Sequence, residues 1–584
     1  MVCLFAANTL GAQWRTETFE LVGGWNAVYL HIDPSHASLG EIVGNDSSNP
    51  IEEIWLWMPA AGTMQFIESP QEPSAGGTQW LRWDRYWGGS SPLQRLAPNA
   101  AYLVRVRSDV GAYTWTLKGK PVAPHVSWTS SGLNFIGIPT PRTNPPTWGT
   151  FLGPSRTLHN EAEIYHYPGG PFDDENPARL WPTLLRQTPL NRGEAYWVRA
   201  DEYNRYFGPL AIDLQGRGEV RFGALAGQHR IRLRNPIDQP VTVSARLISS
   251  ESPPPGERPI AGNVPLIWRG ELDMSDLTYD FGRFEDGPAE WTLQPSGQPG
   301  SEVEVVLGLD RSAMTGEAGD LFAGILEVTD SQGMLAIDLP VSAEVASTTG
   351  LWVGNALVAE VGHQLVTYAE TESGALVEDE NGGYVVESVD ESFGPVARPF
   401  PLRLILHDDG ENGATLMQRI YFGPLDEDNV GLARRESALD STLLSAARRI
   451  SAAHLPWTEE NRSWTFNGRL HEAAEIAVTV PLAHDDNPSN PFLHTYHPDH
   501  DNFDARFEQP LPQGAESYGI TRRISLRVEP PAGHFADIVA GGGILSGTYE
   551  ETVTLHGAGN ATREYRVRGG FALNRIIDIA TLSD

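Results

Sequence analysis

The heptapeptide GWNAVYL, residues 24–30, has a counterpart in GLNFIGI at residues 132–138. Three further blocks return in the same order: EIWLW at 53–57 as EIYHY at 163–167, LAPNAAYLVR at 96–105 as LNRGEAYWVR at 190–199, and YTWTL at 113–117 as YFGPL at 206–210. Each block alternates or runs apolar over about five residues between Gly, Pro or Asn, which is typical of short strands. The repeat predicts two related β modules with cores rich in Trp and Tyr, at residues 14–125 and 126–214.

The middle of the first copy is longer than that of the second, with residues 58–95 against 168–189. It contains QWLRWDRYWGG, in which Trp80, Trp83, Tyr86 and Trp87 lie close together. Flat aromatic rings offer a large contact area at a low entropic cost, so these four could form an exposed platform for a sugar or polymer. They could equally fill the core of the module. The self-comparison gives the second copy no such rings, which favours the binding hypothesis.

The GWN opening and the later AYWV segment resemble modules of exported bacterial surface proteins of unknown activity. This resemblance covers roughly residues 20–214 and implies a secreted, periplasmic or cell-surface location. The first residues, MVCLFAANTLGAQ, look like the end of a secretory signal, so residues 1–13 are expected to be a signal-peptide remnant. Cys3 is the single cysteine, and a large exported chain without disulfides is typical of bacteria.

Composition narrows the class of protein further. A chain of 584 residues is too long for one hydrophobic core, and its 59 glycines and 44 prolines favour many short strands joined by turns. The net charge of −33 makes the chain acidic and argues against nucleic acid as a partner. After residue 13 there is no run of about 18 apolar residues, so we expect no membrane insertion.

Residues 215–348 have a different sequence pattern from that of the two repeat copies. Strand-like segments at 229–248, 301–310, 319–330 and 333–345 are separated by turns. They resemble the immunoglobulin-like (Ig-like) β-sandwiches attached to many secreted proteins, although the cysteine pair of antibody domains is absent. The resemblance implies a spacer or an adhesive module, and fold alone carries little functional weight.

Residues 349–584 are expected to form a C-terminal β-rich domain with one helix. The segment at 432–454, LARRESALDSTLLSAARRISAAH, is rich in Ala, Leu and Arg and contains no Gly or Pro. Such a composition predicts a helix, which would end before Pro456. The expected fold class is therefore mostly β and multidomain: two small N-terminal modules, an Ig-like sandwich and this domain.

A loop rich in His and Asp, HDDNPSNPFLHTYHPDHDN at 484–502, lies between two strand-like segments of this domain. Carboxylates favour Ca²⁺, whereas several imidazoles favour Zn²⁺, so a divalent metal is one hypothesis. The alternatives are a hydrogen-bonded polar loop or a catalytic site. The candidate metal ligands are His484, Asp485, Asp486, His494, His497, Asp499, His500 and Asp501.

Other catalytic motifs fail on particular residues. HEAAE at 471–475 has Glu475 where a zinc protease needs its second histidine, and AESYG at 515–519 lacks the first glycine of a nucleophile elbow. We therefore expect no enzyme, but a non-catalytic binding, adhesion or scaffold protein whose partner is a surface polymer, a glycan or another surface protein. Two alternatives stay open: a carbohydrate-binding protein that uses the aromatic cluster, and a metal-dependent hydrolase that uses the His/Asp loop.

Overall fold

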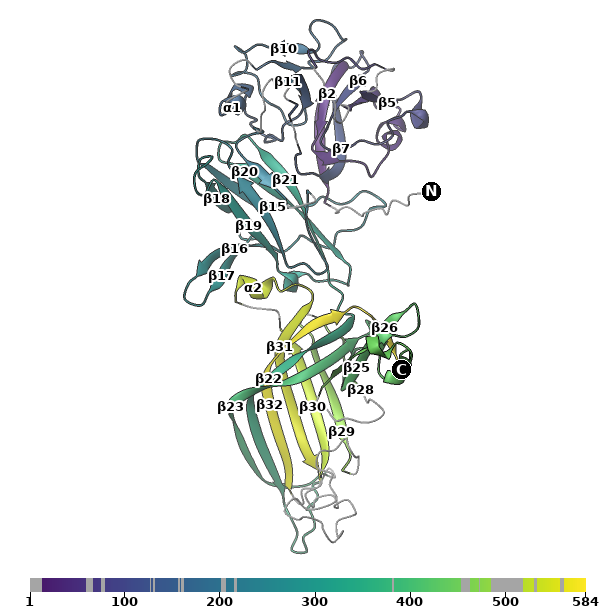
Figure 1. The fold of residues 1–584 in the computed structure, drawn as a ribbon, viewed down its shortest axis with the longest axis vertical. Coiled ribbons are helices and arrows are strands. Elements are labelled where there is room, and N and C mark those ends of the chain that lie inside the picture. The colour runs from purple at the N-terminus through teal and green to yellow at the C-terminus, as the bar shows by residue number, and fades with distance from the viewer. Residues whose placement is uncertain are drawn as a thin grey trace. The chain divides into compact units, whose positions relative to one another are not determined.

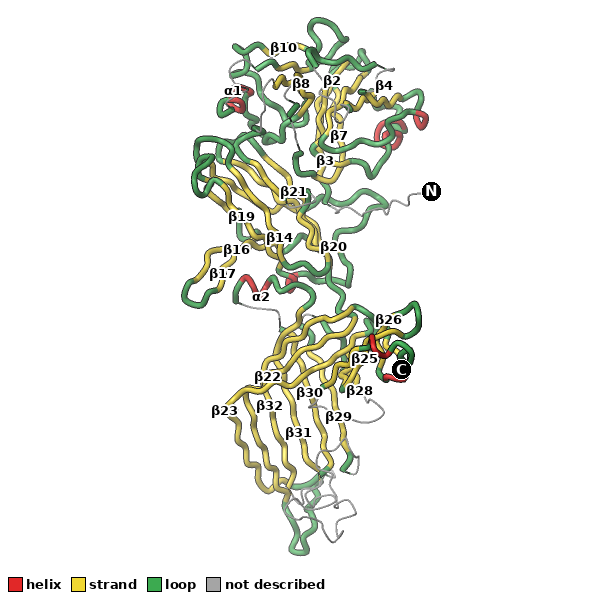
Figure 2. The backbone as a smooth tube through the Cα atoms, viewed as in Figure 1, coloured by secondary structure: helices red, strands yellow, loops and turns green. Residues whose placement is uncertain are grey.

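The computed structural model describes residues 13–58, 67–74, 79–125, 128–129, 132–155, 158, 162–200, 206–214, 218–380, 383–452, 463–471, 473–484, 518–529, 533–556 and 561–584. Strands dominate it and its helices are short (Figure 2), which confirms the mostly β, multidomain fold class. The chain divides into two compact units, which we call unit 1 and unit 2. Unit 1 comprises Met1–Val345 with His534–Val539, and unit 2 comprises Ala346–Gly533 with Ala540–Asp584. The finer domain boundaries inside unit 1 stay predictions.

The first repeat copy contains two antiparallel sheets of unit 1 (Figure 1). Its strands are β1 (Arg15–Leu21), β2 (Gly24–Leu30), β3 (Ile32–Asp33), β4 (Ile51–Trp57), β5 (Trp80–Asp84), β6 (Ala100–Val106) and β7 (Tyr113–Pro121). One sheet has the order β2-β6-β4-β5 and the other β1-β7-β3. Short helical turns occur at η1 (Gly40–Gly44) and η2 (Gly88–Ser90).

The second copy repeats the larger of these sheets strand for strand. It comprises β8 (Gly132–Ile136), α1 (Trp148–Leu152), β9 (Ile164–His166), β10 (Ala178–Leu180) and β11 (Tyr196–Ala200), with the sheet order β8-β11-β9-β10. Three of the aligned sequence blocks thus occupy the same places in both sheets. The register is also shared, because Trp25 pairs with Arg105 as Leu133 pairs with Arg199. The fourth block is not a strand in the second copy: Gly208 has a φ of 101° and Pro209 has no N–H to donate.

The two sheets pack against each other through an aromatic cluster, which we call the inter-copy cluster. Because side chains alternate along a strand, each sheet buries one face in this cluster and the other in a second core, which for the second copy extends into residues 220–343. The cluster contains Ala27, Tyr29, Trp55, Trp57, Ile67, Trp80, Ala101, Leu103, Leu133, Phe135, Ala195 and Trp197. The expectation of separate Trp/Tyr cores is therefore only partly right, since many of the aromatic rings are shared between the copies.

Backbone contacts between the copies are reciprocal. The N–H of Trp25 donates to the carbonyl of Gly170 at 2.8 Å, and the N–H of Leu133 donates to that of Ile67 at 2.9 Å. The residue before each donor is a glycine with positive φ, and a Cβ on either glycine would collide with the backbone of the opposite copy. This close approach explains why both copies begin their first repeat block with glycine.

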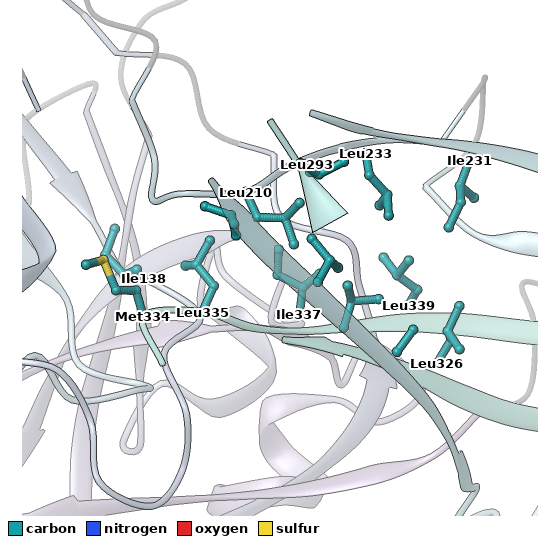
Figure 3. Close-up of a cluster of buried hydrophobic side chains, with 14 of the residues drawn as sticks. Ile138, Leu210, Ile231, Leu233, Leu293, Leu326, Met334, Leu335, Ile337 and Leu339 are labelled. Carbon is teal, nitrogen blue, oxygen red and sulfur yellow. The ribbon is translucent and has the colours of Figure 1, made fainter. Parts of the chain in front are cut away.

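The rest of unit 1 is a β-sandwich of two five-stranded sheets, as the Ig-like texture predicts. Its strands are β12 (Ala211–Asp213), β13 (Val220–Gly223), β14 (Gln228–Arg234), β15 (Val241–Ser249), β16 (Leu266–Asp273), β17 (Thr278–Arg283), β18 (Ala289–Leu293), β19 (Glu302–Leu309), β20 (Leu321–Asp330) and β21 (Ala336–Glu344). The sheet orders are β12-β14-β19-β16-β17 and β13-β21-β20-β15-β18. Figure 3 shows the core between them, which continues without a break to Ile138 of the second copy. The short helix α2 (Phe535–Ile538) packs on β17 and β19.

Unit 2 is built on an eight-stranded antiparallel sheet with the order β28-β24-β23-β22-β32-β31-β30-β29 and a four-stranded sheet β27-β25-β26-β33. The strands are β22 (Gly350–Tyr368), β23 (Val386–Asp408), β24 (Ala414–Met417), β25 (Arg419–Pro424), β26 (Val430–Ala433), β27 (Arg448–Ser451), β28 (Ser463–Thr465), β29 (Glu475–Leu482), β30 (Gly519–Val528), β31 (Ile544–His556), β32 (Ala561–Ile577) and β33 (Leu582–Ser583). Among the described residues, no helix has the length and apolar character needed to cross a membrane.

The helix predicted at 432–454 is wrong for the part that the structure describes. Residues up to 452 form the end of β26, two single 3-10 turns (Glu436–Ala438 and Leu444–Ala446) and β27. Strand β25 lies between β26 and β27, with Tyr421 opposite Ala433 and Ile420 opposite Ile450. Sheet pairing on both sides of β25 therefore overrides a favourable helix composition.

Candidate binding surface around Trp87

The four aromatic residues singled out in the first copy divide into a buried pair and an exposed pair. Trp80 and Trp83 lie on β5 and point to opposite faces of the sheet, where 6% and 1% of their surfaces stay exposed. Tyr86 and Trp87 follow the strand and are 84% and 53% exposed. The carboxylate of Asp84 accepts the N–H of Tyr86 at 2.7 Å and so closes the turn that leads the chain out of the sheet. The surface pair is thus separate from the core pair.

A guanidinium group packs against the ring of the exposed Trp87. The guanidinium carbon of Arg82 lies 4.5 Å from the ring centroid of Trp87 and 5.2 Å from that of Trp55. Such cation–π contacts contribute about 0.5–1 kcal/mol at exposed sites. Arg82 also pairs with the carboxylates of Asp84 and Glu53, which fix its position. One face of the Trp87 ring is therefore against Arg82, while about half of the Trp87 surface stays exposed.

Glu53 connects this surface to the centre of the sheet. Its carboxylate accepts the indole N–H of Trp55 at 2.8 Å and an N–H of Arg105 at 2.9 Å, and it lies 3.2 Å from Arg82. The result is a connected row of charged and aromatic groups across β6, β4 and β5. A flat ring flanked by fixed hydrogen-bonding groups can stack on an apolar face and bond to hydroxyl groups beside it.

The His/Asp loop lies almost wholly outside the described residues. His484, two residues after the end of β29, is half-buried. The other seven candidate ligands, Asp485, Asp486, His494, His497, Asp499, His500 and Asp501, are not described. Within the described ranges, no group of three or more His, Cys, Asp or Glu side chains is arranged to hold a metal ion. The metal hypothesis therefore stays a prediction.

Sequence reasoning missed a cluster of buried charges in unit 1, which we call the Asp338 cluster. The carboxylate of Asp338, on β21, receives N–H groups from Arg15, Arg142 and Arg192 at 3.0, 3.0 and 3.1 Å. Arg192 also donates to Glu17 at 3.0 Å. Burial alone would raise the pKa of Asp338, but the three arginines hold it below its usual range. No local motif could reveal this cluster, because its members lie up to 323 positions apart.

A cavity of about 300 Å³ lies beside the Asp338 cluster, lined in part by Arg142, Arg192 and Glu17. His31 is buried nearby, and burial together with the two arginines holds its pKa well below the usual value, so the imidazole stays neutral. The arginines around the cavity are already paired with carboxylates. We interpret the cluster as structural, since it ties β1, β21 and two loops of the second copy together.

Comparisons with known proteins give no family. No family model matches the chain, and no curated protein matches it. Among solved structures, a protein of unknown function from Bacteroides ovatus is similar over 63% of this chain and 96% of its own, with 9% identity and a TM-score of 0.12. Two structures of Escherichia coli alpha-2-macroglobulin, native and trypsin-activated, each have 9% identity and a TM-score of 0.13. They match 87% and 93% of this chain, which in turn covers only 34% and 39% of theirs. At these scores the similarities carry no argument about function.

Proposed function

We propose that this chain is a non-catalytic binding or scaffold protein of the bacterial cell exterior, whose partner is a surface polymer, a glycan or another surface protein. The observation that carries the proposal is the exposed pair Tyr86 and Trp87, held on a fixed Arg82. Exposing such large rings opposes the hydrophobic effect, and an exposed aromatic group next to fixed polar groups is typical of a contact surface. The export signal expected at residues 1–13 is consistent with a partner outside the cell.

A neutral glycan is the partner class that this surface suits best. Sugar rings offer apolar C–H faces to an indole and hydroxyl groups to nearby charged side chains. The guanidinium of Arg82 is already paired with Glu53 and Asp84, so it brings little free positive charge to attract an anion. The chain as a whole carries a net charge of −33, which repels acidic polymers at long range.

Removing the two exposed rings should weaken this binding without loss of fold. We expect the double variant Tyr86→Ala, Trp87→Ala to bind a neutral polysaccharide at least about tenfold more weakly, which corresponds to about 1.4 kcal/mol. Retention on insoluble cellulose and chitin, measured as depletion from solution, gives the affinity. Trp83 is unsuitable for this test, because its burial means that its loss would damage the core.

The matched control is Met274→Ala, which removes another exposed apolar side chain, 74% exposed, from the β16–β17 hairpin. It should bind like the wild type. Equal retention of the wild type and the Tyr86/Trp87 double variant would overturn the assignment of the site. Failure of the wild type to bind any neutral polysaccharide would exclude a neutral glycan as the partner.

The second candidate function, metal-dependent hydrolysis at the His/Asp loop, stays a hypothesis that rests on the sequence alone. Metal analysis of the purified protein tests it directly. A stoichiometric Zn²⁺ or Ca²⁺ that is lost when His494, His497 and His500 are all changed to Ala would support the hypothesis. No bound ion in the wild type would end it.

A further inference from the structure

The repeat places a second guanidinium where the first copy has Arg82. In the first copy Arg82 lies opposite Trp55 in the pairing of β5 with β4. In the second copy Arg179 lies opposite Tyr165 in the pairing of β10 with β9. Trp55 and Tyr165 are themselves equivalent in the repeated sequence blocks. Strands β5 and β10 are therefore counterparts, and so are the two arginines.

The second arginine also lies against an exposed tryptophan. The guanidinium carbon of Arg179 is 4.7 Å from the ring centroid of Trp181, compared with 4.5 Å between Arg82 and Trp87. Trp181 is 56% exposed and Trp87 is 53% exposed. Of the tryptophans that the structure describes, these are the two with more than half of their surface exposed. The contact between Arg82 and Trp87 in the first copy thus has a counterpart in the second copy, between Arg179 and Trp181.

The acidic partner is repeated as well. Glu163 accepts the hydroxyl of Tyr165 at 2.6 Å and pairs with Arg199. In the first copy, Glu53 accepts the indole N–H of Trp55 and pairs with Arg105. Each copy therefore has five matching groups in the same order across the sheet: an arginine, a glutamate, a buried or half-buried aromatic ring, a second arginine, and an exposed indole.

We propose that unit 1 carries two equivalent subsites for a neutral polysaccharide, one at Trp87 and one at Trp181. This inference rests on the proposed function and extends it from one site to two. Core packing does not require an exposed indole on a guanidinium in either copy, so its presence in both favours a shared contact role. Both copies belong to one compact unit, so binding at one subsite raises the effective concentration of the same polymer at the other. Such coupling can increase avidity by 10²–10⁴-fold.

The experiment compares the wild type with Trp87→Ala, Trp181→Ala and the double variant. The probes are insoluble cellulose and chitin and soluble xylan, with alginate as the acidic comparison. We expect each single variant to lose at least tenfold in affinity for the same polymer, and the double variant to fall to background. With a short oligosaccharide of that polymer, calorimetry should give two sites per chain for the wild type and one for each single variant.

Leu184→Ala is the matched control for the second copy, because Leu184 is 45% exposed and its N–H bonds the carbonyl of Trp181 at 2.8 Å. It should bind like the wild type. If Trp181→Ala also binds like the wild type while Trp87→Ala does not, the second subsite is overturned and the proposed function survives. If the wild type binds no neutral probe, both subsites and the glycan as partner are overturned, and the partner would have to be another surface protein. Retention on alginate alone would overturn the assignment of a neutral sugar.

Discussion

Replacing Asp338 with alanine is expected to lower the free energy of unfolding of unit 1 by about 3–5 kcal/mol at pH 7. The carboxylate of Asp338 is 2% exposed and binds three arginines, of which Arg192 is itself only 7% exposed. Removing the anion leaves these guanidinium groups next to one another without a shared partner, in a place where water can replace it only poorly. Urea unfolding followed by tryptophan fluorescence measures the loss.

Arg246→Ala provides the control for the Asp338 experiment. The Arg246 side chain is 65% exposed and pairs with Glu327, so its loss should cost less than about 1 kcal/mol. Because the folded-state pKa of Asp338 is lowered, its contribution is present above the pKa of the unfolded group and is lost as the pH falls through the folded value. An Asp338→Ala variant as stable as the wild type at pH 7 would show that the cluster adds nothing to stability.

Replacing Trp197 with alanine should cost about 3–5 kcal/mol, because it opens a cavity in the inter-copy cluster. The indole is fully buried, stacks on Phe135 with ring centroids 4.5 Å apart, and contacts Trp57 at 5.1 Å. Its N–H also donates to the hydroxyl of Tyr167 at 2.9 Å. Residues of both copies thus depend on this one ring.

Two further variants test whether the cavity causes the loss of stability in Trp197→Ala: Trp197→Phe and Trp87→Ala. The phenylalanine keeps an aromatic ring and should recover part of the loss, whereas removal of the exposed Trp87 should change stability by less than about 0.5 kcal/mol. Thermal unfolding of all three variants measures their stability, which should fall from Trp87→Ala to Trp197→Phe to Trp197→Ala. A Trp197→Ala variant that unfolds at the wild-type temperature would contradict the view that the copies form one packed body.

The sequence predicted strands best where the signal is local. The aligned blocks around Trp25, Trp55 and Tyr102 are short and largely apolar, and they form β2, β4 and β6. The equivalence of β5 and β10 was not predicted, because the blocks used in the self-comparison do not include either segment and the loops around them differ in length. At 432–454 the composition favoured a helix, and pairing with β25, which is a tertiary effect, decided otherwise.

The candidate site was partly accessible to sequence reasoning. Alternation along WLRWD places Trp83 on the opposite face from Arg82, and both faces of this sheet prove to be covered at Trp80 and Trp83. The exposed position of Trp87 depends on the turn that Asp84 closes, which a pattern of residue types does not specify. The Asp338 cluster depends on chain segments far apart in sequence, so it could only be found in three dimensions.

In this proposal the protein acts by contact, through the two exposed indoles of its repeated modules. An experimental structure of the protein with an oligosaccharide from the retained polysaccharide tests that idea most directly. We expect sugar rings stacked on the free faces of Trp87 and Trp181, opposite Arg82 and Arg179. A saccharide bound elsewhere, for example in the cavity beside Arg142, with both indoles bare, would contradict it.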